Sequence, residues 1–89
     1  MADIEIYTSP FCPFCHRAKA LLKTKGVPFK EIDVMMSSGK RAEMTERSHG
    51  RETVPQIFVD GQHIGDCTEI YQMDAAGKLD AALKLAGPA

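Results

Sequence analysis

The spacing of hydrophobic and polar residues along this chain predicts short strands and helices. Residues 3–8 alternate between polar and apolar side chains with a period of two, which is typical of a strand with one buried face. Over residues 14–25 the apolar side chains recur instead at helical spacing. Pro13 suits the first position of a helix because its missing N–H has no partner there, and Gly26 suits a C-terminal cap. The chain therefore begins with a predicted strand followed by a helix.

The rest of the chain continues to alternate between strands and helices. The further expected elements are a strand ending near Asp33, strands over 56–59 and 62–64, and helices over 40–48, 68–74 and 79–85. Asp60-Gly61 is a strong signal for a two-residue hairpin turn between the last two strands. The order β-α-β-α-β-β-α predicts an α/β fold in which one mixed sheet carries helices on both faces.

Length and composition predict one globular domain, and they give no sign of a polyanionic partner. The 89 residues fit a single domain covering 1–89. Hydrophobic residues make up 44% and charged residues 26%, and the net charge is -1, which gives no reason to expect a nucleic acid or an anionic membrane as partner. No apolar run approaches membrane-spanning length, and the first residues lack the pattern of a secretory signal. We therefore expect a cytoplasmic location.

Two of the three cysteines, Cys12 and Cys15, are the candidate catalytic residues. Cys12 falls at the cap position of the first predicted helix, where free backbone N–H groups and the positive end of the helix dipole favour a thiolate. The thiolate is the reactive species in disulfide exchange. Cys15 lies three residues on, inside the helix, so it should be less exposed and close enough to attack a mixed disulfide on Cys12. The spacing predicts Cys12 as nucleophile and Cys15 as resolving thiol.

Two other interpretations of the cysteine pair compete with this one. The two cysteines could be buried and pack as small apolar residues. They could also form half of a zinc site, which would need two more ligands at suitable spacing. The candidates for those ligands are Cys67, His16, His49 and His63. None of them forms a second close pair in the sequence, so we predict no metal site.

Three motifs together resemble those of the glutaredoxin family, and most closely those of its bacterial dithiol members. These motifs are Cys12-Pro13-Phe14-Cys15, Thr53-Val54-Pro55 and Ile64-Gly65. Their order and spacing match the family over nearly the whole chain. The resemblance implies a thioredoxin fold with a four-stranded mixed sheet. It also implies reduction of protein disulfides and of glutathione mixed disulfides, with glutathione as electron donor, no bound cofactor and a monomeric chain.

The same resemblance implies a glutathione site. It places a cis peptide bond before Pro55, and it pairs the backbone of Val54 with the cysteine of glutathione as strands pair. The backbone N–H groups of Cys67 and Thr68 would hold the γ-glutamyl carboxylate at a helix N-terminus. The remaining family positions are Phe14 and Thr53 beside the cysteine, Arg41 toward the glycyl carboxylate, and Thr68 with Glu69 toward the glutamyl ammonium.

Three residues of this implied site need separate comment. Asp66 stands where the family has a second glycine, so it restricts φ and adds a negative charge beside the proposed carboxylate site. Ser9 stands where many members carry a lysine that contacts glutathione. Cys67 has two interpretations, as a helix-start residue that acts through its backbone or as an auxiliary thiol that becomes glutathionylated.

Two functional alternatives remain open from the sequence. The first is a glutaredoxin-like redoxin that takes its electrons from a thioredoxin reductase. The second is an iron–sulfur cluster carrier in which Cys12 and glutathione from two chains hold the cluster. Measuring turnover with glutathione and with thioredoxin reductase would test the first alternative. The colour of the anaerobically purified protein would test the second.

Overall fold

The computed structural model describes residues 3–83, in which four strands and four helices follow the predicted order. The elements are β1 (Ile4–Thr8), α1 (Pro13–Thr24), β2 (Lys30–Asp33), α2 (Ser38–Arg47), β3 (Gln56–Val59), β4 (Gln62–Gly65), α3 (Cys67–Ala75) and α4 (Leu79–Ala82). The predicted last helix extended to residue 85, and its end lies outside the described residues. None of the described helices has the length and hydropathy that crossing a bilayer requires.

The four strands form one mixed sheet in the order β2-β1-β3-β4. β1 pairs with β2 in parallel and with β3 antiparallel. β3 and β4 form the predicted hairpin, in which Asp60 and Gly61 both have positive φ values of 51° and 83°, as a type I′ turn requires. The mixed sheet expected from the sequence is confirmed. It places β1, the strand that leads to Cys12, in a central position of the sheet.

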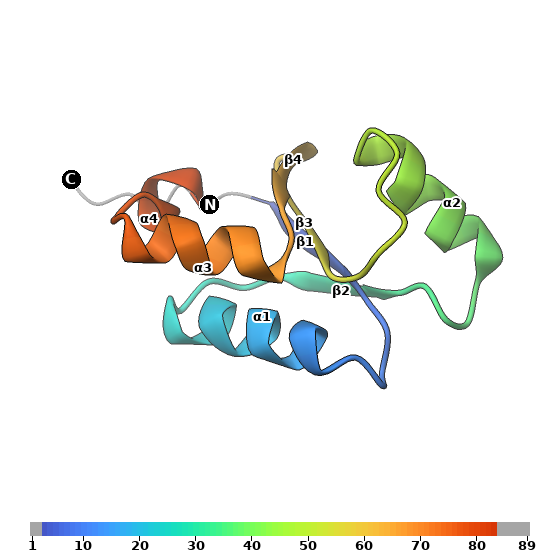
Figure 1. The fold of residues 1–89 in the computed structure, drawn as a ribbon, viewed down its shortest axis with the longest axis horizontal. Coiled ribbons are helices and arrows are strands. Elements are labelled where there is room, and N and C mark those ends of the chain that lie inside the picture. Colours follow the sequence, from blue (N-terminus) through green and yellow to red (C-terminus); the bar gives the residue numbers. More distant parts are fainter. Residues whose placement is uncertain (1–2, 84–89) are drawn as a thin grey trace.

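Helices cover both faces of this sheet, as the pattern predicted (Figure 1). α1, α3 and α4 lie on one face, over a core that includes Ile6, Leu22, Ile57 and Ile70. α2 lies on the other face, where a smaller cluster of buried residues consists of Tyr7, Ile32, Val34, Met44 and Phe58. Figure 1 shows α1 and α3 side by side and α2 apart from them. The larger core therefore lies under α1, the helix that begins directly after Cys12 and contains Cys15.

Polar contacts connect α2 to the sheet. Met44 is its only buried residue. Arg47 binds Glu5 Oε1 at 2.8 Å, donates to the Tyr7 hydroxyl at 2.6 Å, and lies 4.3 Å from the centre of the Phe58 ring. Burial raises the pKa of Tyr7 to about 12. This network compensates for the weak amphipathic pattern that the sequence shows in this segment.

Two helix boundaries differ from the sequence prediction because of capping residues. α2 begins at Ser38 rather than at residue 40, since the Ser37 side chain accepts a hydrogen bond from the Lys40 N–H at 3.3 Å and so caps the first turn. α3 begins one residue earlier than predicted, at Cys67, because Asp66 is its N-cap. This second difference changes the interpretation of the candidate site.

Candidate active site

Cys12 lies at the N-cap of α1, as the sequence predicted. A short turn connects Cys12 to β1. Within this turn the Cys12 N–H donates to the Ser9 carbonyl at 3.3 Å. Pro13 takes the first helical position, no acidic residue occupies the first turn, and no side chain caps the helix. The N–H groups at the start of α1 therefore remain available to stabilise negative charge on the Cys12 sulfur.

Cys15 has the opposite environment. Its side chain is 0% exposed, whereas Cys12 is partly exposed, and both thiols are free. Burial raises the pKa of the Cys15 thiol well above its usual value, with hydrogen bonding and repulsion from Cys12 acting in the same direction. A buried, protonated Cys15 beside an accessible Cys12 supports the predicted division between nucleophile and resolving thiol.

The segment before β3 forms a wall opposite Cys12. The Cys12 Sγ lies 3.7 Å from the Val54 carbonyl oxygen, and the Val54–Pro55 peptide bond is cis, which confirms that expectation. A hollow of about 290 Å³ opens at this place. Its lining residues are Phe14, Thr53, Val54, Pro55, Asp66, Cys67 and Thr68. We call it the Val54 groove, and it contains most of the glutathione contacts implied by the resemblance.

A buried amide that the sequence analysis did not consider supports this wall. Gln56 is 0% exposed, and its Nε2 donates to the Thr53 carbonyl at 3.0 Å. Its Oε1 contacts the His63 Nε2 at 2.6 Å. Burial, followed by the charge of Arg51, lowers the pKa of His63, so the ring is neutral near pH 7 and donates to the amide from Nε2. The pair fixes the Thr53 backbone to the hairpin.

The N-terminus of α3 forms the other side of the groove, and its capping corrects one expectation about Asp66. Asp66 has a φ of -106°, an ordinary value, so no glycine is required there; the positive φ belongs to Gly65. The Asp66 side chain accepts from the Glu69 N–H at 2.9 Å, and the Glu69 side chain accepts from the Asp66 N–H at 3.0 Å. Asp66 is thus a structural cap of the helix whose first N–H groups, at Cys67 and Thr68, are the proposed carboxylate site.

Arg51 is a second residue that the sequence analysis missed. Its guanidinium binds both oxygens of Glu69 and lies 3.7 Å from Asp66 Oδ2. This pairing lowers the pKa of Glu69, so its carboxylate is ionised and already has a partner. The expected contact of Glu69 with a glutamyl ammonium would have to compete with Arg51. The spacing of Asp66 and Glu69 is a capping-box signature that could have predicted the cap, but nothing local indicates Arg51.

Arg41 and Ser9 lie outside the lining of the groove. Arg41, on α2, donates from Nη1 to the Glu52 carbonyl at 2.7 Å, so it contacts the backbone one residue before Thr53. Ser9 contributes its carbonyl to the turn at Cys12. Lys19, which lies 2.9 Å from Glu31, opposes the rise in the pKa of the Cys15 thiol through its positive charge. Arg41 as a ligand for the glycyl carboxylate stays a prediction.

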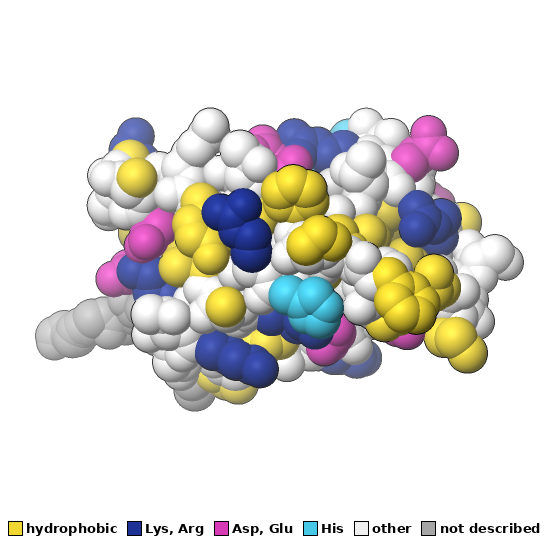
Figure 2. Space-filling model, turned by 60° about the horizontal axis from the view of Figure 1, so that its bottom comes forward, with side chains coloured by type: hydrophobic (Ala, Val, Ile, Leu, Met, Phe, Trp, Pro, Cys, Tyr) yellow, Lys and Arg dark blue, Asp and Glu magenta, His cyan; other side chains and the backbone are white. Residues whose placement is uncertain are grey.

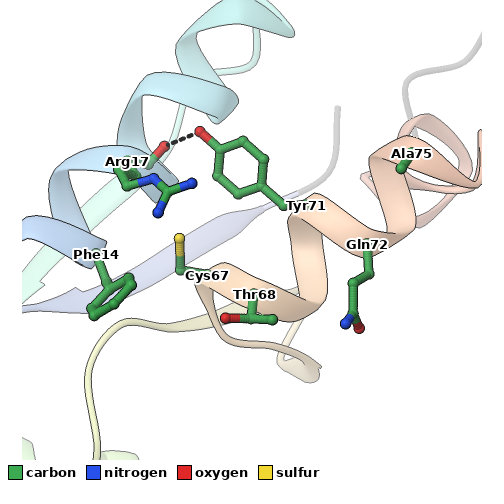
Figure 3. Close-up of a pocket in the computed structure, with 7 residues that line it drawn as sticks. All are labelled: Phe14, Arg17, Cys67, Thr68, Tyr71, Gln72 and Ala75. Atoms are coloured by element: carbon green, nitrogen blue, oxygen red, sulfur yellow. Dashed lines mark hydrogen bonds between the residues drawn. The ribbon is translucent and has the colours of Figure 1, made fainter.

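A second hollow, of about 280 Å³, adjoins the Val54 groove between α1 and α3. Figure 3 shows its lining residues, which are Phe14, Arg17, Cys67, Thr68, Tyr71, Gln72 and Ala75. We call it the α1–α3 hollow. The Cys67 sulfur points toward it, but the residue is only 4% exposed and burial raises the pKa of its thiol. These properties favour a backbone role for Cys67 over that of an auxiliary thiol.

Within residues 3–83, no three His, Cys, Asp or Glu side chains lie close enough together to hold a metal ion. Cys12 and Cys15 are accompanied instead by the helix N-terminus and the carbonyl of Val54. An accessible thiol followed by a buried thiol, at the junction of a central strand and a helix, is the arrangement of a thiol–disulfide oxidoreductase with the thioredoxin fold.

Comparison with known proteins narrows this class. The chain matches the glutaredoxin family over residues 4–64, and it is 58% identical over 84 residues to glutaredoxin 3 of Escherichia coli K12, covering 94% of this chain and all of that protein. The solution structure of glutaredoxin from Brucella melitensis is 49% identical, with a TM-score of 0.83 over all of this chain and 96% of that one. The chain belongs to the glutaredoxin family.

A third comparison concerns a structure with a bound peptide. The crystal structure of a buckwheat glutaredoxin–glutathione complex has a TM-score of 0.84 and 25% identity, over 94% of this chain and 78% of that chain.

The expected four-stranded mixed sheet flanked by helices is therefore the thioredoxin fold that these structures share.

Proposed function

We propose that this chain reduces glutathione mixed disulfides and protein disulfides, with glutathione as electron donor and with Cys12 and Cys15 as the redox pair. The observation that carries the proposal is the position of the Cys12 sulfur, 3.7 Å from the Val54 carbonyl at the edge of the Val54 groove. A peptide whose sulfur reacts at Cys12 thus finds a backbone hydrogen-bond acceptor, the Val54 carbonyl, and a hollow beside that sulfur. The buckwheat glutaredoxin, which is solved as a glutathione complex, supports glutathione as the occupant.

Glutathione would lie along the groove in an extended form. The backbone of Val54 pairs with the cysteine of glutathione as one strand pairs with another. The free N–H groups of Cys67 and Thr68 at the start of α3 receive the γ-glutamyl carboxylate. Phe14, Thr53 and Pro55 line the groove, and Arg41 serves the glycyl carboxylate from α2.

The reaction with a glutathione mixed disulfide needs only Cys12. Its thiolate attacks the glutathionyl sulfur, an S–S bond forms between Cys12 and glutathione, and the substrate leaves as a thiolate that takes up a proton. A second glutathione thiolate then attacks the glutathionyl sulfur. Glutathione disulfide leaves, and the electron pair of the broken bond returns to Cys12 as thiolate. The substrate sulfur is reduced and one free glutathione is oxidised, because the other half of the glutathione disulfide comes from the mixed disulfide itself.

Reduction of a protein disulfide adds Cys15 to this sequence. Cys12 attacks one sulfur of the substrate and releases the other as a thiol. Cys15 then loses its proton and attacks the Cys12 sulfur, which releases the second substrate thiol and leaves a Cys12–Cys15 disulfide for glutathione to reduce. Because burial raises the pKa of Cys15 and keeps it protonated, Cys12 is the thiol that attacks the substrate first. We propose that the chain acts in this way as a monomer in the cytoplasm on glutathionylated or disulfide-containing proteins.

A steady-state assay tests the proposal directly. The substrate is the mixed disulfide of glutathione and 2-mercaptoethanol, with glutathione, glutathione reductase and NADPH as the reducing system. We expect turnover with this system and much less with thioredoxin reductase and NADPH. Turnover supported only by thioredoxin reductase would establish the alternative redoxin function, and a coloured, inactive protein after anaerobic purification would favour the cluster carrier. Arg47→Lys, on the opposite face of the sheet, serves as a control for nonspecific loss of stability.

A further inference from the structure

The α1–α3 hollow shares Phe14, Cys67 and Thr68 with the Val54 groove, whereas the glutathione contacts described above do not use its other lining residues, which are Arg17, Tyr71, Gln72 and Ala75. A molecule attached to the reacting sulfur can therefore extend from one hollow into the other. Phe14 at the shared border is 51% exposed, and Phe11, one residue before the nucleophile, is 81% exposed. These two rings leave apolar surface uncovered on both sides of Cys12.

The charged side chains of α1 are basic. α1 carries Arg17, Lys19 and Lys23 and contains no aspartate or glutamate. On the face of the molecule shown in Figure 2, which includes α1, basic side chains lie among the hydrophobic ones and acidic side chains lie mostly toward the rim. Lys19 is already paired with Glu31 at 2.9 Å. The basic charge that remains belongs to the exposed residues of the helix.

Arg17 is the basic residue of α1 that faces the α1–α3 hollow (Figure 3). Its guanidinium lies 5.3 Å from the centre of the Tyr71 ring, and the Tyr71 hydroxyl donates to the Arg17 carbonyl at 3.0 Å. Across the part of the chain that the structure describes, no carboxylate lies within ion-pair distance of this guanidinium. The ring orients the cation, and its N–H groups remain available for a planar anion.

The distance from the nucleophile limits what this anion can be. Arg17 follows Cys12 by five residues, a rise of about 7.5 Å along a helix. An extended peptide covers that distance with two to three residues at about 3.3 Å each. A carboxylate side chain two or three residues from a substrate cysteine would therefore reach Arg17 while its sulfur reacts at Cys12.

From these observations we propose that the α1–α3 hollow is a specificity subsite of the reaction, in which Arg17, oriented by Tyr71, binds an acidic side chain of the protein substrate. The proposal rests on the function proposed above and adds a preference among substrates. Arg17 acts on the leaving portion of the substrate and takes no part in the disulfide exchange. The ion pair is partly exposed, so its contribution should be modest and should decrease with added salt.

The test uses three peptides of identical length, each with one cysteine joined to glutathione as a mixed disulfide. They carry Glu, Gln or Lys at the second and third positions on both sides of the cysteine. We expect the wild-type kcat/KM for the Glu peptide to exceed that for the Gln peptide by about fivefold, with the Lys peptide lowest. Arg17→Gln should remove this preference, and Arg17→Lys should keep part of it, since lysine preserves the charge but not the planar donor.

Lys23→Gln is the matched control, because it removes the same charge from an exposed position of the same helix. It should leave the preference for the Glu peptide intact. A wild-type enzyme that turns over the three peptides equally, or an Arg17→Gln variant that keeps the preference, would overturn the proposal. It would also be overturned if Arg17→Gln raised the KM for glutathione as reductant and left the peptides unaffected, because the anion would then belong to glutathione.

The mixed disulfide of 2-mercaptoethanol separates this proposal from the more general one. That substrate has no peptide on its leaving side, so it reports only on the Val54 groove and Cys12. If it is not turned over at all, the proposed function fails. If it is turned over normally while the three peptides do not differ, only the specificity subsite fails.

Discussion

Asp66 combines a capping role with a charge beside the proposed carboxylate site, so its replacement tests both. In the structure its side chain accepts the Glu69 N–H at 2.9 Å and lies 3.7 Å from Arg51 Nη1. Asp66→Ala removes the cap and the charge together, whereas Asp66→Asn removes the charge and keeps an oxygen that can accept the same hydrogen bond. Comparing the two variants separates helix capping from electrostatics.

The expected size of the capping effect follows from measurements on other N-caps. Replacing an aspartate cap by alanine costs about 1 kcal/mol, whereas asparagine caps about as well as aspartate. For a domain of this size, 1 kcal/mol corresponds to a shift in Tm of about 4–8 °C. We therefore expect Asp66→Ala to lower Tm by several degrees and Asp66→Asn to lower it by less than half as much, the remaining loss coming from the partly exposed contact with Arg51.

The charge should be visible in glutathione binding. Without the carboxylate, the N–H groups of Cys67 and Thr68 receive the γ-glutamyl carboxylate with less repulsion, although Arg51 already offsets part of that charge. Asp66→Asn should lower the KM for glutathione mixed disulfides by up to about fivefold, equivalent to ~1 kcal/mol. The gain should decrease as salt is added.

Thermal unfolding and steady-state kinetics at low and high salt measure both effects. Glu46→Gln is the matched control because it removes the same charge from an exposed side chain of α2, and it should leave the KM unchanged. Equal loss of Tm in the Asn and Ala variants would show that the charge, not the hydrogen-bonding cap, stabilises α3. An Asn variant with unchanged KM at low salt would place the carboxylate site elsewhere.

Three further predictions follow from the same structure. Cys12→Ser should abolish all disulfide reduction, whereas Cys15→Ser should keep activity on glutathione mixed disulfides and lose most activity on protein disulfides; equal losses on both substrates would contradict the assigned roles. Iodoacetamide labelling of Cys15 in the Cys12→Ser variant should increase with pH beyond 9, because burial raises the pKa of this thiol and the thiolate forms only at high pH; labelling that is already complete at pH 8 would refute the burial argument. Gly65→Ala should destabilise the fold by about 1–3 kcal/mol in urea denaturation, since φ is 143° and a Cβ would lie 2.7 Å from the Glu69 Cβ; a neutral substitution would mean that the turn is free to relax.

The features that the sequence predicted correctly depend on neighbouring residues. Pro13 after Cys12 indicates the start of a helix, and Asp60-Gly61 indicates a two-residue turn, because each pattern limits the backbone within a few residues. The structure places these elements where they were expected. The exposure of the two cysteines was predictable for the same reason, since a cap position is more accessible than a position inside the helix.

The features that the sequence did not predict depend on distant partners. Arg51 meets Glu69 across 18 positions, and Gln56 meets His63 across a hairpin, and neither pairing has a local pattern. Asp66 was interpreted as a replacement for glycine, although its spacing to Glu69 already matched a capping box. A family pattern alone was less informative at this position than the hydrogen-bonding capacity of the side chains.

The two outer strands of the sheet also bear on how the chain behaves at high concentration. β2 and β4 are each only four residues long, and β2 begins with an exposed lysine and glutamate, Lys30 and Glu31. The pairing of β3 with β4 is interrupted by an irregularity between Ile57 and Phe58. Short, charged or irregular outer strands are poor templates for another chain. The sheet is therefore protected against edge-to-edge aggregation, while the exposed rings beside the nucleophile stay accessible for transient contact with other proteins.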